Sequence, residues 1–129
     1  AMTYTLKPHP NYHVNAGDYP SLNLKVVLEP LEKIMPDFDI VYSANTTSAA
    51  VDAYLTGLPV VVVMDGRYLN MSLLRGKQGV CFVSAAKELA EALQVSGKSV
   101  AIDSDKKDFY FVDPELSRWK RLLLSATPA

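Results

Sequence analysis

The chain has 129 residues, 49% of them hydrophobic, which suits one compact domain with its own core and leaves little room for a second. Its formal net charge is -1 and no block of like charge occurs, so binding to nucleic acid through a broad basic surface is not expected. The single cysteine, Cys81, excludes an internal disulfide and a cysteine-based zinc site; it lies in an apolar run and is predicted to be a small core residue.

The first half of the chain alternates strand-like and helix-like segments. Residues 3–6 are predicted to form a strand that stops at Lys7-Pro8-His9-Pro10, because two prolines remove backbone donors and force extended geometry. Residues 24–28 are predicted to form a second strand. Residues 30–35 are predicted to form a short helix that begins with proline and closes before the next one.

The clearest strand-helix-strand unit follows. Residues 39–43 are predicted to form a strand, and capping side chains then precede a helix expected over about residues 47–56. Gly57 suits the left-handed position that ends a helix, and residues 60–64 form a run that is apolar on both faces, as central parallel strands are.

The second half continues this alternation. Residues 65–79 are predicted to form a polar loop, with one helical turn around residues 70–74, before a strand at 80–83. Ser84 is expected to cap a helix with Leu89, Ala90 and Leu93 on one face.

The last predicted elements are a strand at residues 109–112 and a helix through Leu124. Asp113-Pro114-Glu115 is typical of the beginning of a helix, and Trp119 within that helix is predicted to anchor its packing. Strands alternating with helices predict an α/β fold: a single Rossmann-like, doubly wound domain with a mostly parallel sheet flanked by helices.

Residues 1–2 are interpreted as a cloning remnant, residues 3–125 as the domain and residues 126–129 as a tail. No apolar stretch approaches the ~20 residues of a transmembrane helix, and the N-terminus lacks the layout of a signal peptide. We therefore expect a cytoplasmic protein without a transmembrane segment; the inner face of the membrane is a second location open to the full-length protein.

Polar residues follow several of the predicted strands, where ligands bind in open α/β sheets. Lys7 and His9 follow the first strand, residues 43–48 follow the third, and Asp65 and Gly66 follow the fourth. The start of the helix near Thr47 offers free backbone N–H groups and flanking hydroxyls, which suit a phosphate but also serve as ordinary helix caps.

The segment Lys7-Pro8-His9-Pro10 is more specific, because a cation and an imidazole held by two prolines are pre-organised for an anionic oxygen. The alternative is a surface turn in which His9 caps a backbone carbonyl. His13 lacks the further ligands of a metal site and is expected to be solvated, and no metal site is predicted. Glu29, at the end of the second strand, suits a ribose or base edge, or else the first turn of the following helix.

The loop over residues 65–79 offers only weaker candidates for contacts with a ligand. Asn70 and Arg75 are weaker candidates for contacts with a sugar or phosphate, and Asp52 is expected to be solvated. None of the common dinucleotide-binding, Walker, hydrolase-elbow or zinc-protease motifs occurs. The sequence therefore excludes the commonest dinucleotide-binding, phosphoryl-transfer, hydrolase and zinc-site interpretations.

Three segments in order, KPHP at 7–10, YSANTTSAAVDA at 42–53 and GLPVV at 57–61, resemble the C-terminal half of GT-B glycosyltransferases. The resemblance is to bacterial sialyltransferases and polysialyltransferases in particular, and to related proteins of surface carbohydrate biosynthesis. The segment DPELSRW at 113–119 also resembles the C-terminal end of this last group. It covers residues 3 to about 124. Pro8 replaces the glycine that one sialyltransferase group has at this position, and Thr47-Ser48 replaces the serine pair of that group.

The resemblance implies that the chain binds a nucleotide-sugar donor, such as a CMP- or UDP-sugar, without a further cofactor. His9 would be catalytic and would contact the donor phosphate together with Thr46, Thr47 and Ser48, while Glu29 would lie near the ribose or base. Lys7, Ser43 and Asn45 complete the implied donor site. The carbohydrate acceptor and the general base would belong to an N-terminal GT-B domain outside this sequence, so the isolated half is expected to be inactive.

Two other interpretations stay open. One is a binding or dimerisation module of the same fold without turnover, and the other is a fragment of a sugar-nucleotide epimerase, since those enzymes share the architecture.

Overall fold

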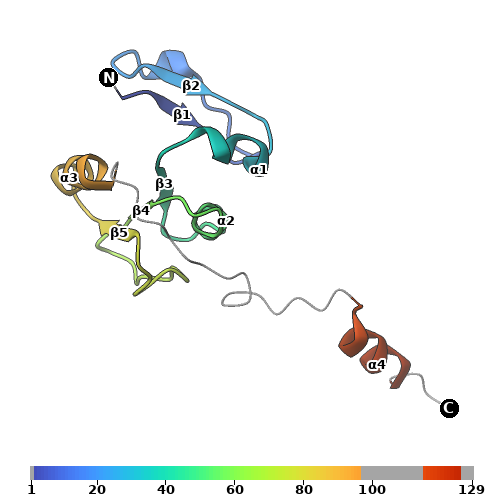
Figure 1. Cartoon of the computed structure of the whole chain (residues 1–129). Coiled ribbons are helices and arrows are strands. Elements are labelled where there is room, and N and C mark those ends of the chain that lie inside the picture. Colours follow the sequence, from blue (N-terminus) through green and yellow to red (C-terminus); the bar gives the residue numbers. More distant parts are fainter. Residues whose placement is uncertain (1, 97–114, 126–129) are drawn as a thin grey trace.

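The computed structural model describes residues 2–96 and 115–125, and Figure 1 shows the arrangement of their helices and strands. The strand predicted over residues 109–112 and the capping residues 113 and 114 lie outside the described residues. The described part is an α/β structure in which every hydrogen-bonded strand pair is parallel.

The first sheet has two short strands, β1 (Tyr4–Leu6) and β2 (Leu24–Val26). Leu6 pairs with Val26, and the N–H of Val27 extends the ladder by donating to the carbonyl of Leu6 at 3.0 Å. Strand β1 ends at Leu6, directly before the Lys7–Pro10 segment as predicted, and Pro8 has no backbone N–H to continue a ladder. Pro8 itself is buried, which fixes the beginning of the loop to the domain.

Two short helical segments lead from the first sheet to the second. Helix α1 (Leu31–Ile34) begins after Pro30, and the 3₁₀ helix η2 (Met35–Asp37) follows it directly, with Pro36 in its first turn. The α-helix therefore ends before Pro36, as predicted, but the chain continues to turn because proline fits the first turn of a helix. A further 3₁₀ helix, η1 (Ala16–Asp18), precedes β2.

The second sheet contains β3 (Val41–Ala44), β4 (Val60–Val63) and β5 (Val80–Val83), in that order. Helix α2 (Ala49–Leu55) links β3 to β4, and α3 (Ala86–Ser96) follows β5. Figure 1 shows α2 and α3 on opposite sides of β4. This is the predicted strand-helix-strand alternation.

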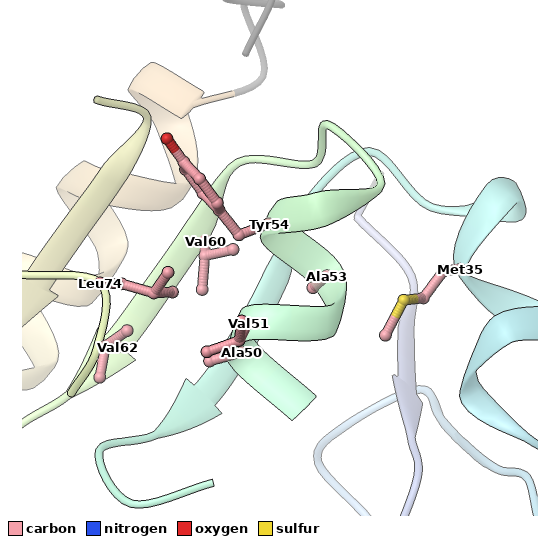
Figure 2. Packing of buried hydrophobic residues seen from close by; sticks show 8 residues of the cluster. All are labelled: Met35, Ala50, Val51, Ala53, Tyr54, Val60, Val62 and Leu74. Carbon is pink, nitrogen blue, oxygen red and sulfur yellow. The ribbon is translucent and has the colours of Figure 1, made fainter. Parts of the chain in front are cut away.

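Strand β4 is the centre of the core because both of its faces are covered. Val60 and Val62 pack with buried residues of α2, and Figure 2 shows these side chains meeting Leu74 and Tyr54. Val61 faces the other way and packs with Val83 and Ala92. The continuous valine run of β4 follows from this position, since a strand covered on both faces buries every side chain.

Gly57 ends α2 as expected. Its φ of 87° is in the left-handed region, and its N–H donates to the carbonyl of Tyr54 at 3.0 Å. At the other end the helix begins at Ala49, two residues later than predicted, because Thr47 Oγ1 accepts the N–H of Ala49 (3.2 Å) from outside the helix.

The predicted single sheet is instead two small sheets among the described residues, with no ladder between the β1–β2 pair and β3. Strands β1 and β2 have only three residues each, and a proline-rich loop follows β1, so they offer few backbone N–H and C=O groups for pairing with another strand. The prediction of one continuous doubly wound sheet is therefore only partly confirmed.

Three predictions about side chains were wrong. Cys81 is exposed, because β5 is an edge strand of the second sheet and only part of its face is covered by α3. On α3, Ala92 is buried and Ala90 is exposed, because a step of three residues from Leu89 keeps to the covered face. Trp119, predicted as a packing anchor, is 62% exposed.

The loop at 65–79 was predicted to contain a helical turn at residues 70–74, and it contains none there. Asn70 Oδ1 accepts the N–H of Ser72 (3.0 Å), and Ser72 Oγ accepts the N–H of Leu74 (3.1 Å). Such side-chain bonds compete with the backbone bonds of a helix and favour turns.

Helix α4 (Ser117–Ser125) is the last described element, and none of its residues is buried. Within residues 2–96 and 115–125, no helix has both the length and the apolar character needed to cross a membrane.

Candidate functional site at the carboxyl ends of the strands

Two segments that carry the predicted site residues directly follow parallel strands, although the two strands belong to different sheets. The loop that starts at Lys7 follows β1, and residues 45–48 join β3 to α2. Each predicted phosphate-binding segment therefore leaves its strand at the carboxyl end, where ligands bind in open α/β sheets.

His9 lies exposed in a turn that orients its ring. The N–H of Asn11 donates to His9 Nδ1 at 3.2 Å, and the N–H of Tyr12 donates to the carbonyl of His9 at 2.9 Å. The ring of Tyr12 stands edge-on to the imidazole, with centroids 6.0 Å apart. His9 therefore lies in a surface turn, as in the alternative interpretation, but its imidazole accepts a backbone N–H instead of capping a carbonyl.

This hydrogen bond determines which nitrogen carries the proton. Because Nδ1 accepts, the neutral imidazole of His9 is protonated on Nε2. An Nε2–H group on an exposed ring is a donor directed away from the turn, and a phosphate oxygen is a suitable acceptor for it. His13, expected to be solvated, is also exposed.

Lys7 and Glu29 lie close enough at the ends of β1 and β2 for their charges to interact. Backbone N–H groups of Glu29 and Leu28 hold the pKa of the Glu29 carboxyl below its ordinary value, and the charges of Lys25 and Lys7 lower it further. The bond from Leu28 N–H to Oε2 is 3.1 Å long. Lys7 Nζ donates to the carbonyl of Pro8 at 3.3 Å, so both side chains are folded onto their own loops.

At the end of β3, Ser43 and Asn45 are held by the protein itself. Ser43 is buried and its hydroxyl donates to the carbonyl of Ala44 at 3.5 Å. Asn45 Nδ2 donates to the carbonyl of Leu69 at 3.1 Å, while its buried Oδ1 has no hydrogen-bond partner among the described residues. Of these two predicted ligand residues, Asn45 is the one with unused hydrogen-bonding capacity.

Thr46, Thr47 and Ser48 stand directly before α2. Thr46 and Ser48 are exposed, and Thr47 is half-buried with its Oγ1 accepting the N–H of Ala49. The Thr47 hydroxyl can still donate its own hydrogen while it accepts. The three hydroxyls therefore remain potential donors to an anion.

One charged pair in the neighbouring loop was not anticipated. Arg67 Nη2 contacts Asp65 Oδ2 at 2.8 Å, and its Nε contacts Oδ1 at 3.1 Å. Arg67 holds the pKa of the Asp65 carboxyl below its ordinary value. The spacing Asp65-Gly66-Arg67 was the available signal, since a tight turn of this length brings the two ends together.

Asn70 and Arg75, the weaker candidates for ligand contacts, form hydrogen bonds within the loop itself. Arg75 Nη1 donates to the carbonyl of Asn70, and Asn70 Oδ1 holds the N–H of Ser72. Asp52 is exposed on α2, as expected. In the described part of the chain, no three metal-ligating side chains gather where they could hold an ion.

Comparisons of the chain with protein-family models, with curated proteins and with solved structures return no match. The resemblance to GT-B glycosyltransferases therefore stays a prediction from the sequence motifs.

Proposed function

We propose that the chain is the nucleotide-sugar-binding half of a GT-B glycosyltransferase that acts in surface polysaccharide or lipopolysaccharide biosynthesis. The observation that supports this most directly is that the Lys7–Pro10 loop and residues 45–48 each follow the carboxyl end of a parallel strand, β1 and β3. Ligands bind at these strand ends in open α/β sheets. A donor phosphate bound between the two segments would meet donors from both.

In this proposal His9 is the catalytic residue. Its Nε2–H donates to a phosphate oxygen of the donor, and the ammonium of Lys7 adds positive charge nearby. The hydroxyls of Thr46, Thr47 and Ser48 donate from the other side. The carboxylate of Glu29, close to Lys7, accepts hydroxyl or amine hydrogens of the ribose or base in this proposal.

The chemical role of these groups is electrostatic. When the bond between the sugar and the nucleotide phosphate breaks, negative charge grows on the phosphate oxygens. Donors that are already oriented stabilise this charge without reorganising, and that lowers the barrier. The turn bond from Asn11 to His9 Nδ1 is such an orienting contact. This role needs no metal ion, and an acceptor domain must supply the general base.

The proposal is tested by calorimetric titration of the 129-residue chain with CMP, UDP and their sugars. His9→Ala removes a hydrogen bond to a charged group and should weaken binding about tenfold or more. His13→Ala is the matched control, because it removes a nearby exposed histidine that the proposal does not use. Equal effects of the two variants, or no nucleotide binding by the unaltered chain, would refute the donor site.

A second candidate is a binding or dimerisation module of the same fold. It is favoured by four large apolar side chains exposed in the loop between β4 and β5: Tyr68, Leu69, Met71 and Leu73. Large apolar side chains exposed close together in one loop suit a contact with another protein or domain. Sedimentation of a dimer that does not respond to nucleotides would favour this candidate. Product analysis of a full-length enzyme separates transfer from epimerisation.

A further inference from the structure

Helix α4 presents an apolar stripe that the rest of the described chain leaves uncovered. Trp119, Leu122 and Leu123 recur at the spacing of one helical face and are between 59% and 68% exposed. Exposed single leucines are common, but three large apolar side chains on one face of a helix need a covering surface.

The cations of the same helix lie around this stripe. At about 100° per residue, Arg118 and Lys120 fall on either side of it and Arg121 falls on the far side. Residues 115–125 carry three cations and one acid, whereas residues 2–96 carry seven cations and nine acids. Positive charge is thus concentrated on α4, away from a slightly acidic domain.

We propose that α4 binds an anionic membrane surface, lying parallel to it with Trp119, Leu122 and Leu123 inserted among the lipids. Long cationic side chains at the edges of an apolar stripe can reach up to lipid phosphates while their methylene groups stay in the apolar layer. Trp is well suited to this boundary, because its ring is apolar and its N–H is a donor.

The length of the helix fixes the kind of contact. Nine residues span roughly 14 Å, too short for a hydrocarbon layer of about 30 Å, so α4 lies on the membrane rather than across it. A helix this short is also marginal in water by itself. A partner protein would have to supply an acidic groove matched to the stripe, whereas a lipid surface needs no matched shape, and this favours the lipid.

This inference goes beyond the proposed donor site and uses none of its residues. Loss of membrane binding would leave nucleotide binding by His9 unaffected, and failure of the donor site would leave α4 unaffected.

Intrinsic fluorescence gives a direct test, because Trp119 is the only tryptophan of the chain. The 129-residue protein is mixed with vesicles of phosphatidylcholine alone, or of phosphatidylcholine and phosphatidylglycerol in equal parts. We expect a blue shift of the emission and co-sedimentation with the anionic vesicles only, both decreasing as salt is added.

Four substitutions on α4 separate the apolar and the charged contributions to binding. Leu122→Asp should abolish binding, while Leu124→Asp, the same change on the other side of the helix, should retain most of it. Arg118→Gln and Lys120→Gln should each weaken binding about fivefold. Lys33→Gln, on α1, is the matched control and should have no effect.

Three results would overturn the inference. One is an emission that does not respond to anionic vesicles. The second is equal loss of binding in Leu122→Asp and Leu124→Asp. The third is an emission already blue-shifted without vesicles, which would show that Trp119 packs against protein; concentration-dependent sedimentation would then identify a second copy as the partner.

Discussion

The side-chain amide of Asn45 donates to the carbonyl of Leu69 across 3.1 Å, joining the end of β3 to the loop that follows β4. Two segments 24 positions apart are thereby held together beside the proposed donor site. Asn45→Asp keeps the shape of the side chain but replaces the donor with a carboxylate that repels the Leu69 carbonyl.

We expect Asn45→Asp to lower the free energy of unfolding by about 2 kcal/mol at neutral pH. The difference from the unaltered chain should shrink in acid, where the protonated carboxyl can donate to Leu69. Urea unfolding at both pH values measures this. Asn23→Asp, at an exposed position, is the control, and an equal loss in both variants would show that Asn45 is only a surface residue.

The loop between β4 and β5 contributes one leucine to the core and exposes its neighbour. Leu74 is fully buried beside Val60 and Val62, whereas Leu73 is 62% exposed. Leu74→Ala should therefore cost about 2 to 5 kcal/mol of unfolding free energy, and Leu73→Ala should change it by less than about 0.5 kcal/mol. Chemical denaturation of the two variants distinguishes them, and similar midpoints would mean that the loop does not pack as described.

Much of the second sheet could be predicted from the sequence because its signals are local. The run at 60–63, the glycine at 57 and the proline at 59 fix one strand and one helix end by simple backbone rules. Which strands pair is not a local property. The separation of β1 and β2 from β3, and the exposure of Cys81 on an edge strand, depend on neighbours distant in sequence.

The candidate site was predictable in outline but not in detail. That Lys7, Glu29 and Thr47 follow strands or precede a helix could be read from residue types. The turn that makes His9 Nδ1 an acceptor, the bond from Asn45 to Leu69 and the pairing of Arg67 with Asp65 depend on side-chain geometry. A helix through Leu124 was predicted from its first-turn residues, but the exposure of Trp119 on that helix was not.

Gly57 provides a backbone test of the end of α2. Its φ of 87° is unfavourable for residues with a Cβ, so Gly57→Ala should cost about 1 to 2 kcal/mol. Gly66→Ala is the matched control, since a Cβ added there meets nothing within 4 Å and its φ is not in the left-handed region. Thermal unfolding measures both. A Gly66 variant as unstable as the Gly57 variant would contradict this assignment.

The ion pair of Asp65 and Arg67 predicts a titration shift. Arg67 holds the pKa of Asp65 below its ordinary value of about 3.9. A lowered pKa in the folded state contributes stability above the ordinary value, and this is lost as the pH falls through the lowered one. Both side chains are exposed, so the contribution to stability is small and the titration itself is the better readout.

Carbon NMR of the Asp65 carboxyl should show a midpoint below that of free aspartate, and Arg67→Ala should raise it toward the ordinary value. Arg75→Ala removes a cation from the same loop that does not contact Asp65 and should leave the midpoint unchanged. A midpoint insensitive to Arg67 would show that the pair does not persist in solution.

The proposed donor site requires that the stiff Lys7–Pro10 loop and the amino end of α2 hold one phosphate between them. Amide NMR of the labelled chain during titration with CMP, UDP and their sugars tests it residue by residue. We expect shift changes concentrated at His9 and at Thr46 to Ser48, saturating together with one affinity. Changes that are absent from either segment, or that saturate at different concentrations in the two, would refute the donor site.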